Sequence, residues 1–290
     1  MRAKVSSLEL PGLLQLLARL ILALPLMVGP AVAQMTELPI LFDARERLAR
    51  PDVNDILRLR FLTTADFPPF NFTDQTGRLA GFHVDLARAL CAELGMENRC
   101  QIQALPYDQL ATALEGGQGE AVLAGVAVTS ELRERFRFTR PYLLLPARFL
   151  TNKQASLART DARALYGKPV GVIKGTAHEA MLRAFFPDVK AQGFDTRDAM
   201  LEALKVKTVD AVFADALQLS FWMTSPASAG CCDLFDGPYL SEQFLGEGMT
   251  IMVGGQDARL SAALESALAA VSRDGRLEEI YLRYFPTGIY

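Results

Sequence analysis

The chain has 290 residues, half of them hydrophobic, and a formal net charge of −3. This mildly acidic balance, without basic stretches interleaved with aromatic residues, argues against a nucleic-acid partner. The length suits one large domain or two lobes of ordinary size. The two histidines, His83 and His178, have no metal-ligand spacing around them, so we expect no metal site and no cofactor.

The first 33 residues have the pattern of a secretory signal peptide. Basic residues precede a short apolar run at 20–28, and small residues at Ala31 and Ala33 form an A-x-A site, so we expect cleavage after Ala33. The apolar run is shorter than the roughly 20 residues that span a bilayer, which makes an uncleaved anchor the weaker alternative. No cysteine follows the cleavage site, which disfavours a lipoprotein. We therefore expect an exported protein in the periplasm.

Residues 34–57 are expected to form an irregular, charged N-terminal arm. The periodic pattern that follows alternates between strands and helices, with apolar positions such as Val84, Leu86 and Leu90 on one helix face. This order predicts a doubly wound β-α-β-α-β unit. Its expected elements are a strand at 57–65, a helix at 80–95, a strand at 100–106, a helix at 107–117 and a strand at 120–128.

A second unit of the same kind begins after an apolar crossing segment at 140–152. Its expected elements are a strand at 170–174, a helix from Ala177, another helix and the strand Ala211 to Ala214. A returning strand at 248–255 and two closing helices end the chain. The α/β pattern therefore predicts a first lobe at 58–145 and 248–290 and a second lobe at 146–247, joined by two crossovers.

The four cysteines fall into two pairs. Cys91 and Cys100 lie at the end of a helix and the start of the next strand, a spacing that brings two Cα atoms within disulfide range, so we expect a bridge in an oxidising compartment. Cys231 and Cys232 are adjacent. They are expected to be reduced and partly buried, with a vicinal disulfide as the alternative.

The stretches at 59–95, 119–142, 167–179, 209–215 and 272–286 resemble family 3 extracellular solute-binding proteins, the polar-amino-acid receptors of ABC importers. The resemblance covers roughly residues 58 to 287. It implies a type II periplasmic binding protein fold, or Venus flytrap, with a two-strand hinge. A disulfide like Cys91–Cys100 occurs in some members, whereas the family prefers an acid at the position of His83.

The ligand is expected at the carboxyl ends of the strands, where loops and helix N-termini present free N–H groups. The resemblance implies that Phe67 is the aromatic floor and that Asp215 anchors an amine, although Phe67 could be a core residue and Asp215 a helix N-cap. Phe70 is expected in the core. The full set of expected ligand-binding residues is Asp66, Phe67, Gly125, Ala127, Thr129, Arg133, Thr176, Ala177 and Asp215.

The carboxylate side of this expected site departs from the family. The pattern places the clamping arginine at Leu132, and two positions that usually carry hydroxyl groups are Ala127 and Ala177. Arg133, one residue later, is displaced by about 100° around a helix and could still reach the ligand. The neighbouring Arg135, Arg137 and Arg140 are expected on the surface. These departures favour an amine, an atypical amino-acid derivative or another small polar solute. The alternative is a standard amino acid held by Arg133 and the N–H groups of Gly125, Ala127 and Thr176.

The leading hypothesis is a monomeric periplasmic binding protein that closes around a small solute and delivers it to the membrane permease of an ABC importer. One alternative is an enzyme on the same fold that resembles cyclohexadienyl dehydratases, with His178 or Glu179 as the acid. Another is a sensor or docking module, suggested by the arm at 34–57. No catalytic dyad or phosphate-binding loop is visible, so we expect no enzyme.

Overall fold

The computed structural model describes residues 38–43, 45–286 and 288–290. The expected signal peptide at 1–33 and the beginning of the arm lie outside the described residues. No helix within these described ranges combines the length and the apolar character that crossing a bilayer requires.

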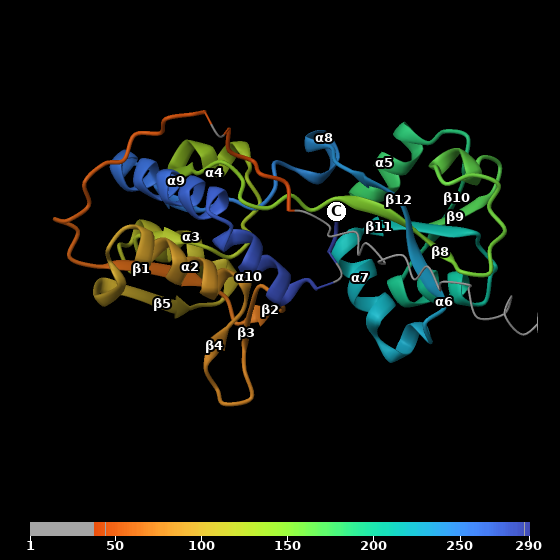
Figure 1. The fold of residues 1–290 in the computed structure, drawn as a ribbon, viewed down its shortest axis with the longest axis horizontal. Helices are drawn as coiled ribbons and strands as arrows, with labels where there is room; N and C mark the ends of the chain where they lie inside the picture. Colours follow the sequence, from red (N-terminus) through yellow and green to blue (C-terminus); the bar gives the residue numbers. More distant parts are fainter. Residues whose placement is uncertain (1–37, 44, 287) are drawn as a thin grey trace, which may run out of the picture. The chain divides into compact units, whose positions relative to one another are not determined.

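The first lobe contains a five-stranded sheet in the order β5-β1-β6-β13-β7, in which β5, β1 and β6 are parallel and β13 is antiparallel to its neighbours. Figure 1 labels its strands β1 and β5. Helix α2 contacts α9 and α10, which come from the far end of the chain. The predicted apolar positions Val84, Leu86 and Leu90 of α2 are buried. The strands are β1 (Leu59–Thr63), β5 (Cys100–Ala104), β6 (Ala121–Val122), β7 (Phe136–Phe138) and β13 (Met252–Gly254), and the helices are α2 (Phe82–Glu93), α3 (Leu110–Glu115), α4 (Ser130–Arg135), α9 (Ala258–Arg273) and α10 (Arg276–Tyr284).

The second lobe contains a five-stranded sheet in the order β10-β9-β11-β8-β12. Strands β10, β9 and β11 are parallel, and β8 is antiparallel to both β11 and β12. The order repeats that of the first lobe, so the predicted type II periplasmic binding protein fold is confirmed. The strands are β8 (Ala147–Asn152), β9 (Pro169–Ile173), β10 (Lys190–Phe194), β11 (Ala211–Asp215) and β12 (Cys232–Tyr239), and the helices are α5 (Ala177–Phe185), α6 (Arg197–Lys205), α7 (Ala216–Thr224) and α8 (Glu242–Leu245).

Two chain segments connect the sheets, one between β7 and β8 and one between β12 and β13. They run antiparallel where Leu143 pairs with Met249. The backbone N–H of Tyr142 donates to the carbonyl of Met249 at 2.8 Å, and that of Met249 donates to Leu143 at 2.7 Å. The first segment is a crossing segment as predicted, although regular strand begins only at Ala147.

The described part of the arm lies against the first lobe. Leu38, Phe42 and Val53 are buried in the same apolar cluster as α2, α9 and α10. The arm itself contains no regular helix or strand in its described residues, as predicted. Apolar burial therefore makes the arm part of the lobe's core.

Several strands were not predicted. β7, β10 and β12 each lie at an edge of a five-stranded sheet. A separate three-stranded sheet of β2 (Asp66–Phe67), β3 (Asn71–Thr73) and β4 (Leu79–Ala80) was also missed. Edge strands and short hairpins carry polar side chains on their exposed faces, and their apolar pattern is correspondingly weak.

Candidate ligand-binding site

Three helices of the second lobe begin at one edge of its sheet. Strands β9, β10 and β11 are neighbours and parallel, so their carboxyl ends lie together. Each strand leads within a few residues into a helix, α5, α6 or α7. The positive ends of three helix dipoles and their free N–H groups therefore face this edge.

Each of the three helices has a side-chain N-cap. Thr176 accepts a hydrogen bond from the backbone N–H of Glu179, and Thr196 accepts one from Ala199, both at 3.2 Å. Asp215 accepts a bond from the backbone N–H of Gln218 at 2.9 Å. The alternative role of Asp215 as a helix N-cap is thus present in the structure, and one of its oxygens is left for another partner.

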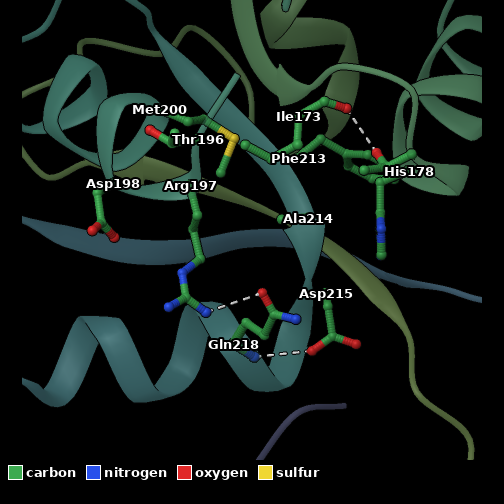
Figure 2. A pocket seen from close by; sticks show the side chains of 11 residues that line it. Ile173, His178, Thr196, Arg197, Asp198, Met200, Phe213, Ala214, Asp215 and Gln218 are labelled. Atoms are coloured by element: carbon green, nitrogen blue, oxygen red, sulfur yellow. Dashed lines mark hydrogen bonds between the residues drawn. The ribbon is translucent and has the colours of Figure 1, made fainter. Parts of the chain in front are cut away.

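A cavity of about 420 Å³ opens at this edge (Figure 2). Its lining combines an apolar base with polar and charged side chains from all three helices. The lining residues are Ile173, Thr176, His178, Thr196, Arg197, Asp198, Met200, Phe213, Ala214, Asp215 and Gln218. A concave, partly apolar pocket with a few convergent polar groups is typical of a small-molecule site.

Asp215 and His178 have opposite pKa shifts in this cavity. Burial raises the pKa of Asp215, although the backbone N–H of Gln218 and the nearby His178 oppose this. Burial also lowers the pKa of His178, against the effect of Asp215. The Nε2 atom of His178 is buried without a hydrogen-bond partner among the described residues. Both groups are therefore polar groups in need of a partner.

The first lobe brings Phe67 and Gly125 together. A Cβ atom on Gly125 would lie 3.1 Å from Cε1 of Phe67, and the backbone there has a φ of +67°, which favours glycine. Phe67 is 37% exposed and stacks on Phe70, with ring centroids 4.8 Å apart. Phe70 is fully buried, as predicted. Asp66 is exposed at the start of the same hairpin.

The segment expected to clamp a carboxylate has an apolar residue at the family's arginine position. Leu132 is partly buried and packs against an apolar cluster of the first lobe. Arg133 is exposed, lies over the ring of Phe138 and forms an ion pair with Glu247. Ala127 and Thr129 are exposed, and Thr129 caps α4 by accepting from Leu132. In the second lobe Ala177 is the exposed first residue of α5.

The other three arginines differ among themselves. Arg135 forms two hydrogen bonds of 2.8 Å to Glu115 on the surface, and Arg137 donates to a backbone carbonyl. Arg140 also reaches the surface, with its side chain 34% exposed, but it is half-buried between Glu46 of the arm and Glu265 of α9. Its position between two acids explains the burial.

Sequence reasoning missed Arg197, Asp198 and Gln218 as cavity residues. Arg197 and Asp198 open α6, directly after β10, and β10 was not predicted. The signal was present in Thr196, a good N-cap residue ahead of an apolar-periodic stretch. Gln218 follows from Asp215, because a side chain three residues after an N-cap lies close to it.

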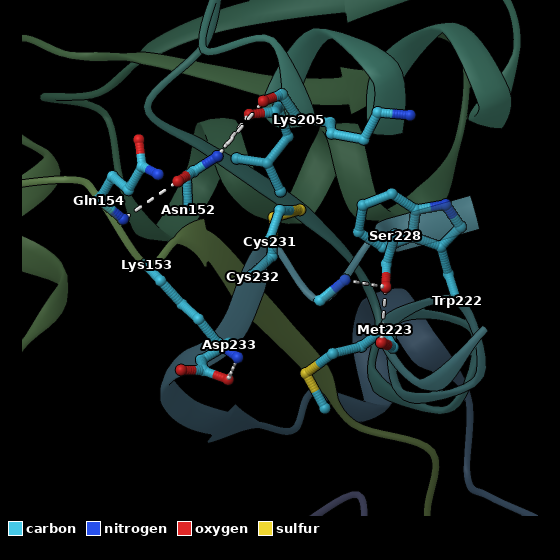
Figure 3. Close-up of a disulfide and its surroundings, with 12 residues drawn as sticks. Asn152, Lys153, Gln154, Lys205, Trp222, Met223, Ser228, Cys231, Cys232 and Asp233 are labelled. Carbon is cyan, nitrogen blue, oxygen red and sulfur yellow. Dashed lines mark hydrogen bonds and ion pairs between the residues drawn. A yellow bond between two sulfur atoms is a disulfide. The ribbon is translucent and has the colours of Figure 1, made fainter. Parts of the chain in front are cut away.

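Both cysteine pairs are oxidised and lie outside the lining of this cavity. The predicted Cys91–Cys100 disulfide is confirmed, with Cα atoms 6.1 Å apart. The expectation that Cys231 and Cys232 are reduced is wrong, because they form a vicinal disulfide at the start of β12 (Figure 3). Neighbouring cysteines are close to each other in any fold, so their spacing in the sequence could not decide between the reduced and the oxidised state.

Comparison with known proteins identifies the family. The model of the bacterial extracellular solute-binding proteins, family 3, matches residues 59–287. The chain belongs to this family.

Relatives of this solute-binding protein are of similar length. It is 32% identical to the putative ABC transporter arginine-binding protein 2 of Escherichia coli, over 78% of this chain and 90% of the relative. It is 31% identical to the L-arginine-binding protein of Pseudomonas aeruginosa, over 78% and 87% of the two chains. The unliganded L-cystine solute receptor of Neisseria gonorrhoeae shares the fold, with a TM-score of 0.68 at 17% identity, over 79% of this chain and 92% of that one.

Proposed function

We propose that this solute-binding protein works in the periplasm, binds a small solute with a cationic amine or guanidinium group, and delivers it to the membrane permease of an ABC importer. Two relatives above 30% identity carry arginine binding in their names, which supports a cationic solute. The same relatives are named as binding proteins, which favours transport over the dehydratase alternative. We further propose that the protein is a monomer.

The observation that carries this proposal is the state of Asp215. It is a half-buried carboxylate in a cavity, and within the described residues it has no ion pair with any lysine or arginine. Its described hydrogen-bond donors are backbone N–H groups at the start of α7, with that of Gln218 at 2.9 Å. A buried carboxylate without a cation is costly, and a cationic ligand group would remove that cost.

We propose that binding closes the two lobes, 58–145 with 248–290 and 146–247, over the ligand. Phe67 offers an aromatic face on the first lobe, and aromatic faces attract cations and pack against apolar stems. The two connecting segments pair at Leu143 and Met249, and we propose that they act as the hinge. The ligand would complete contacts that neither lobe makes alone.

The test is a thermal-shift screen of amines, amino acids and organic acids, followed by calorimetry with L-arginine and agmatine. Asp215→Asn keeps the N-cap but removes the charge, and we expect it to weaken binding by about thirtyfold or more. Asp233→Asn, which changes an exposed acid paired with Lys153 in the same lobe, is the matched control. Stabilisation by organic acids alone, or equal binding by both variants, would overturn the proposal.

A further inference from the structure

Arg197 is a charged cavity residue that the proposed amine site does not use. It is the first residue of α6 and its guanidinium donates to the side-chain oxygen of Gln218 at 3.3 Å. Within the described part of the chain it forms no ion pair. In Figure 2 its side chain extends toward Gln218, whereas Asp198 extends away from it.

The position of Arg197 is unfavourable for the helix. A cation in the first turn opposes the helix dipole, and the last turn, where Lys205 stands, is the favourable place for one. The side chain is exposed and packs no core. Helix stability therefore gives no reason for an arginine here, and the open fork of N–H donors is available to a partner from solvent.

Gln218 connects this arginine to the amine anchor. Its backbone N–H donates to Asp215 and its side-chain oxygen accepts from Arg197. One residue of α7 thus places a carboxylate and a guanidinium on the same wall of one cavity. The carboxylate of Asp215 and the guanidinium of Arg197 have opposite charges, but they do not lie within ion-pair distance of each other.

We infer that Arg197 binds the carboxylate of the ligand, so that the second lobe holds both charges of an amino acid. This inference rests on the proposed function, in which Asp215 holds the ligand's cationic group. The guanidinium replaces the carboxylate-clamping arginine that the family pattern places at Leu132 in the first lobe. It is suited to this role because a planar guanidinium forms two parallel hydrogen bonds with a carboxylate. The protein then selects an amino acid over the corresponding amine.

The experiment compares L-arginine with agmatine, which lacks only the carboxylate, by calorimetry on the mature protein. We expect the wild type to bind L-arginine more tightly. Arg197→Met and Arg197→Gln should weaken L-arginine binding by about tenfold and leave agmatine unchanged, as expected for a lost charged hydrogen bond. Arg197→Lys should recover part of the loss. Arg163→Met, an exposed arginine elsewhere in the lobe, should change neither ligand.

The outcomes separate the two proposals. If Asp215→Asn abolishes binding while the Arg197 variants bind both ligands like the wild type, the amine site stands and the role of Arg197 is wrong. If the Arg197 variants lose affinity equally for L-arginine and agmatine, the role of Arg197 is also contradicted, because that loss would not depend on the carboxylate. If no amine or amino acid in the screen binds the wild type, the proposed function fails, and the inference fails with it.

Discussion

The hydroxyl of Tyr142 lies 2.7 Å from Nε2 of His83, and both side chains are buried in the first lobe. On the other side of the ring, Nδ1 lies 3.0 Å from the side-chain oxygen of Asn71. That oxygen can only accept, so Nδ1 carries the proton and Tyr142 donates to Nε2. The histidine is thus held neutral by a donor on one side and an acceptor on the other.

This arrangement predicts acid sensitivity. Burial lowers the pKa of His83 from 6.5 to about 3. Between these values the unfolded chain binds a proton that the folded chain does not, so the free energy of unfolding falls as the pH falls, by at most about 1.4 kcal/mol per pH unit from this group. The free energy of unfolding, measured by chemical denaturation at pH 7, 6, 5 and 4, should fall less steeply with decreasing pH in His83→Gln than in the wild type. An identical slope in the two proteins would refute the assignment.

The two disulfides should differ in their contribution to stability. Cys91–Cys100 closes a loop with a sequence separation of nine residues, whereas Cys231–Cys232 joins neighbours. Because the entropy removed from the unfolded chain grows with loop length, Cys91→Ala with Cys100→Ala should cost about 2–3 kcal/mol. The double substitution Cys231→Ala and Cys232→Ala should cost less. Urea denaturation of both double variants decides, and the reverse order would contradict the prediction.

The sequence predicted the inner strands of both sheets and the edge strand β5, and it missed the edge strands β7, β10 and β12. β9 and β11 lie inside their sheet and are largely apolar runs, which is the signal of buried parallel strands, whereas Arg60 interrupts the apolar residues of β1. β10 has the sequence KAQGF with alternate residues exposed, and such a stretch cannot be distinguished from a loop. Its omission also hid Arg197, because a helix start is recognised as a site only when a strand end is known beside it.

The role of a single residue could be predicted where its contacts are with residues near it in sequence, and not where its partners are far away in the chain. The N-cap role of Asp215 follows from local spacing and is present in the structure. The half-buried state of Arg140 arises from Glu46 and Glu265, which are 94 and 125 residues away. Such long-range partners have no trace in a local pattern. The vicinal disulfide is equally invisible, because oxidation state is not a property of spacing.

Arg140 should hold the arm on the first lobe. It bonds Glu46 at 2.6 Å and lies 4.8 Å from the ring centroid of Phe42, both in the arm. Arg140→Ala leaves two acids without their cation, so we expect a loss of about 1 kcal/mol in unfolding free energy and faster proteolysis within residues 38–57. Arg135→Ala, which breaks an exposed pair with Glu115, should change neither. Equal protease resistance of the wild type and Arg140→Ala would count against this anchoring role.

Arg133 should contribute little to ligand binding. Its guanidinium is engaged by Glu247 and lies over Phe138, on the surface of α4. An arginine that already has a carboxylate partner gains little from exchanging it for another. We expect Arg133→Ala to change the Kd for L-arginine by less than about twofold. If this variant abolishes binding while Asp215→Asn is tolerated, the ligand is an acid held by the first lobe.

The last prediction concerns closure. If Asp215 on the second lobe and Phe67 on the first both contact the ligand, binding favours the conformation in which the two lobes approach each other. Small-angle scattering with a saturating concentration of L-arginine should then give a smaller radius of gyration than the free protein. Asp215→Asn at the same ligand concentration should keep the radius of the free protein, because it lacks the contact that links ligand to lobe. A radius that stays constant while calorimetry shows saturation would mean that the ligand binds to one lobe without drawing in the other.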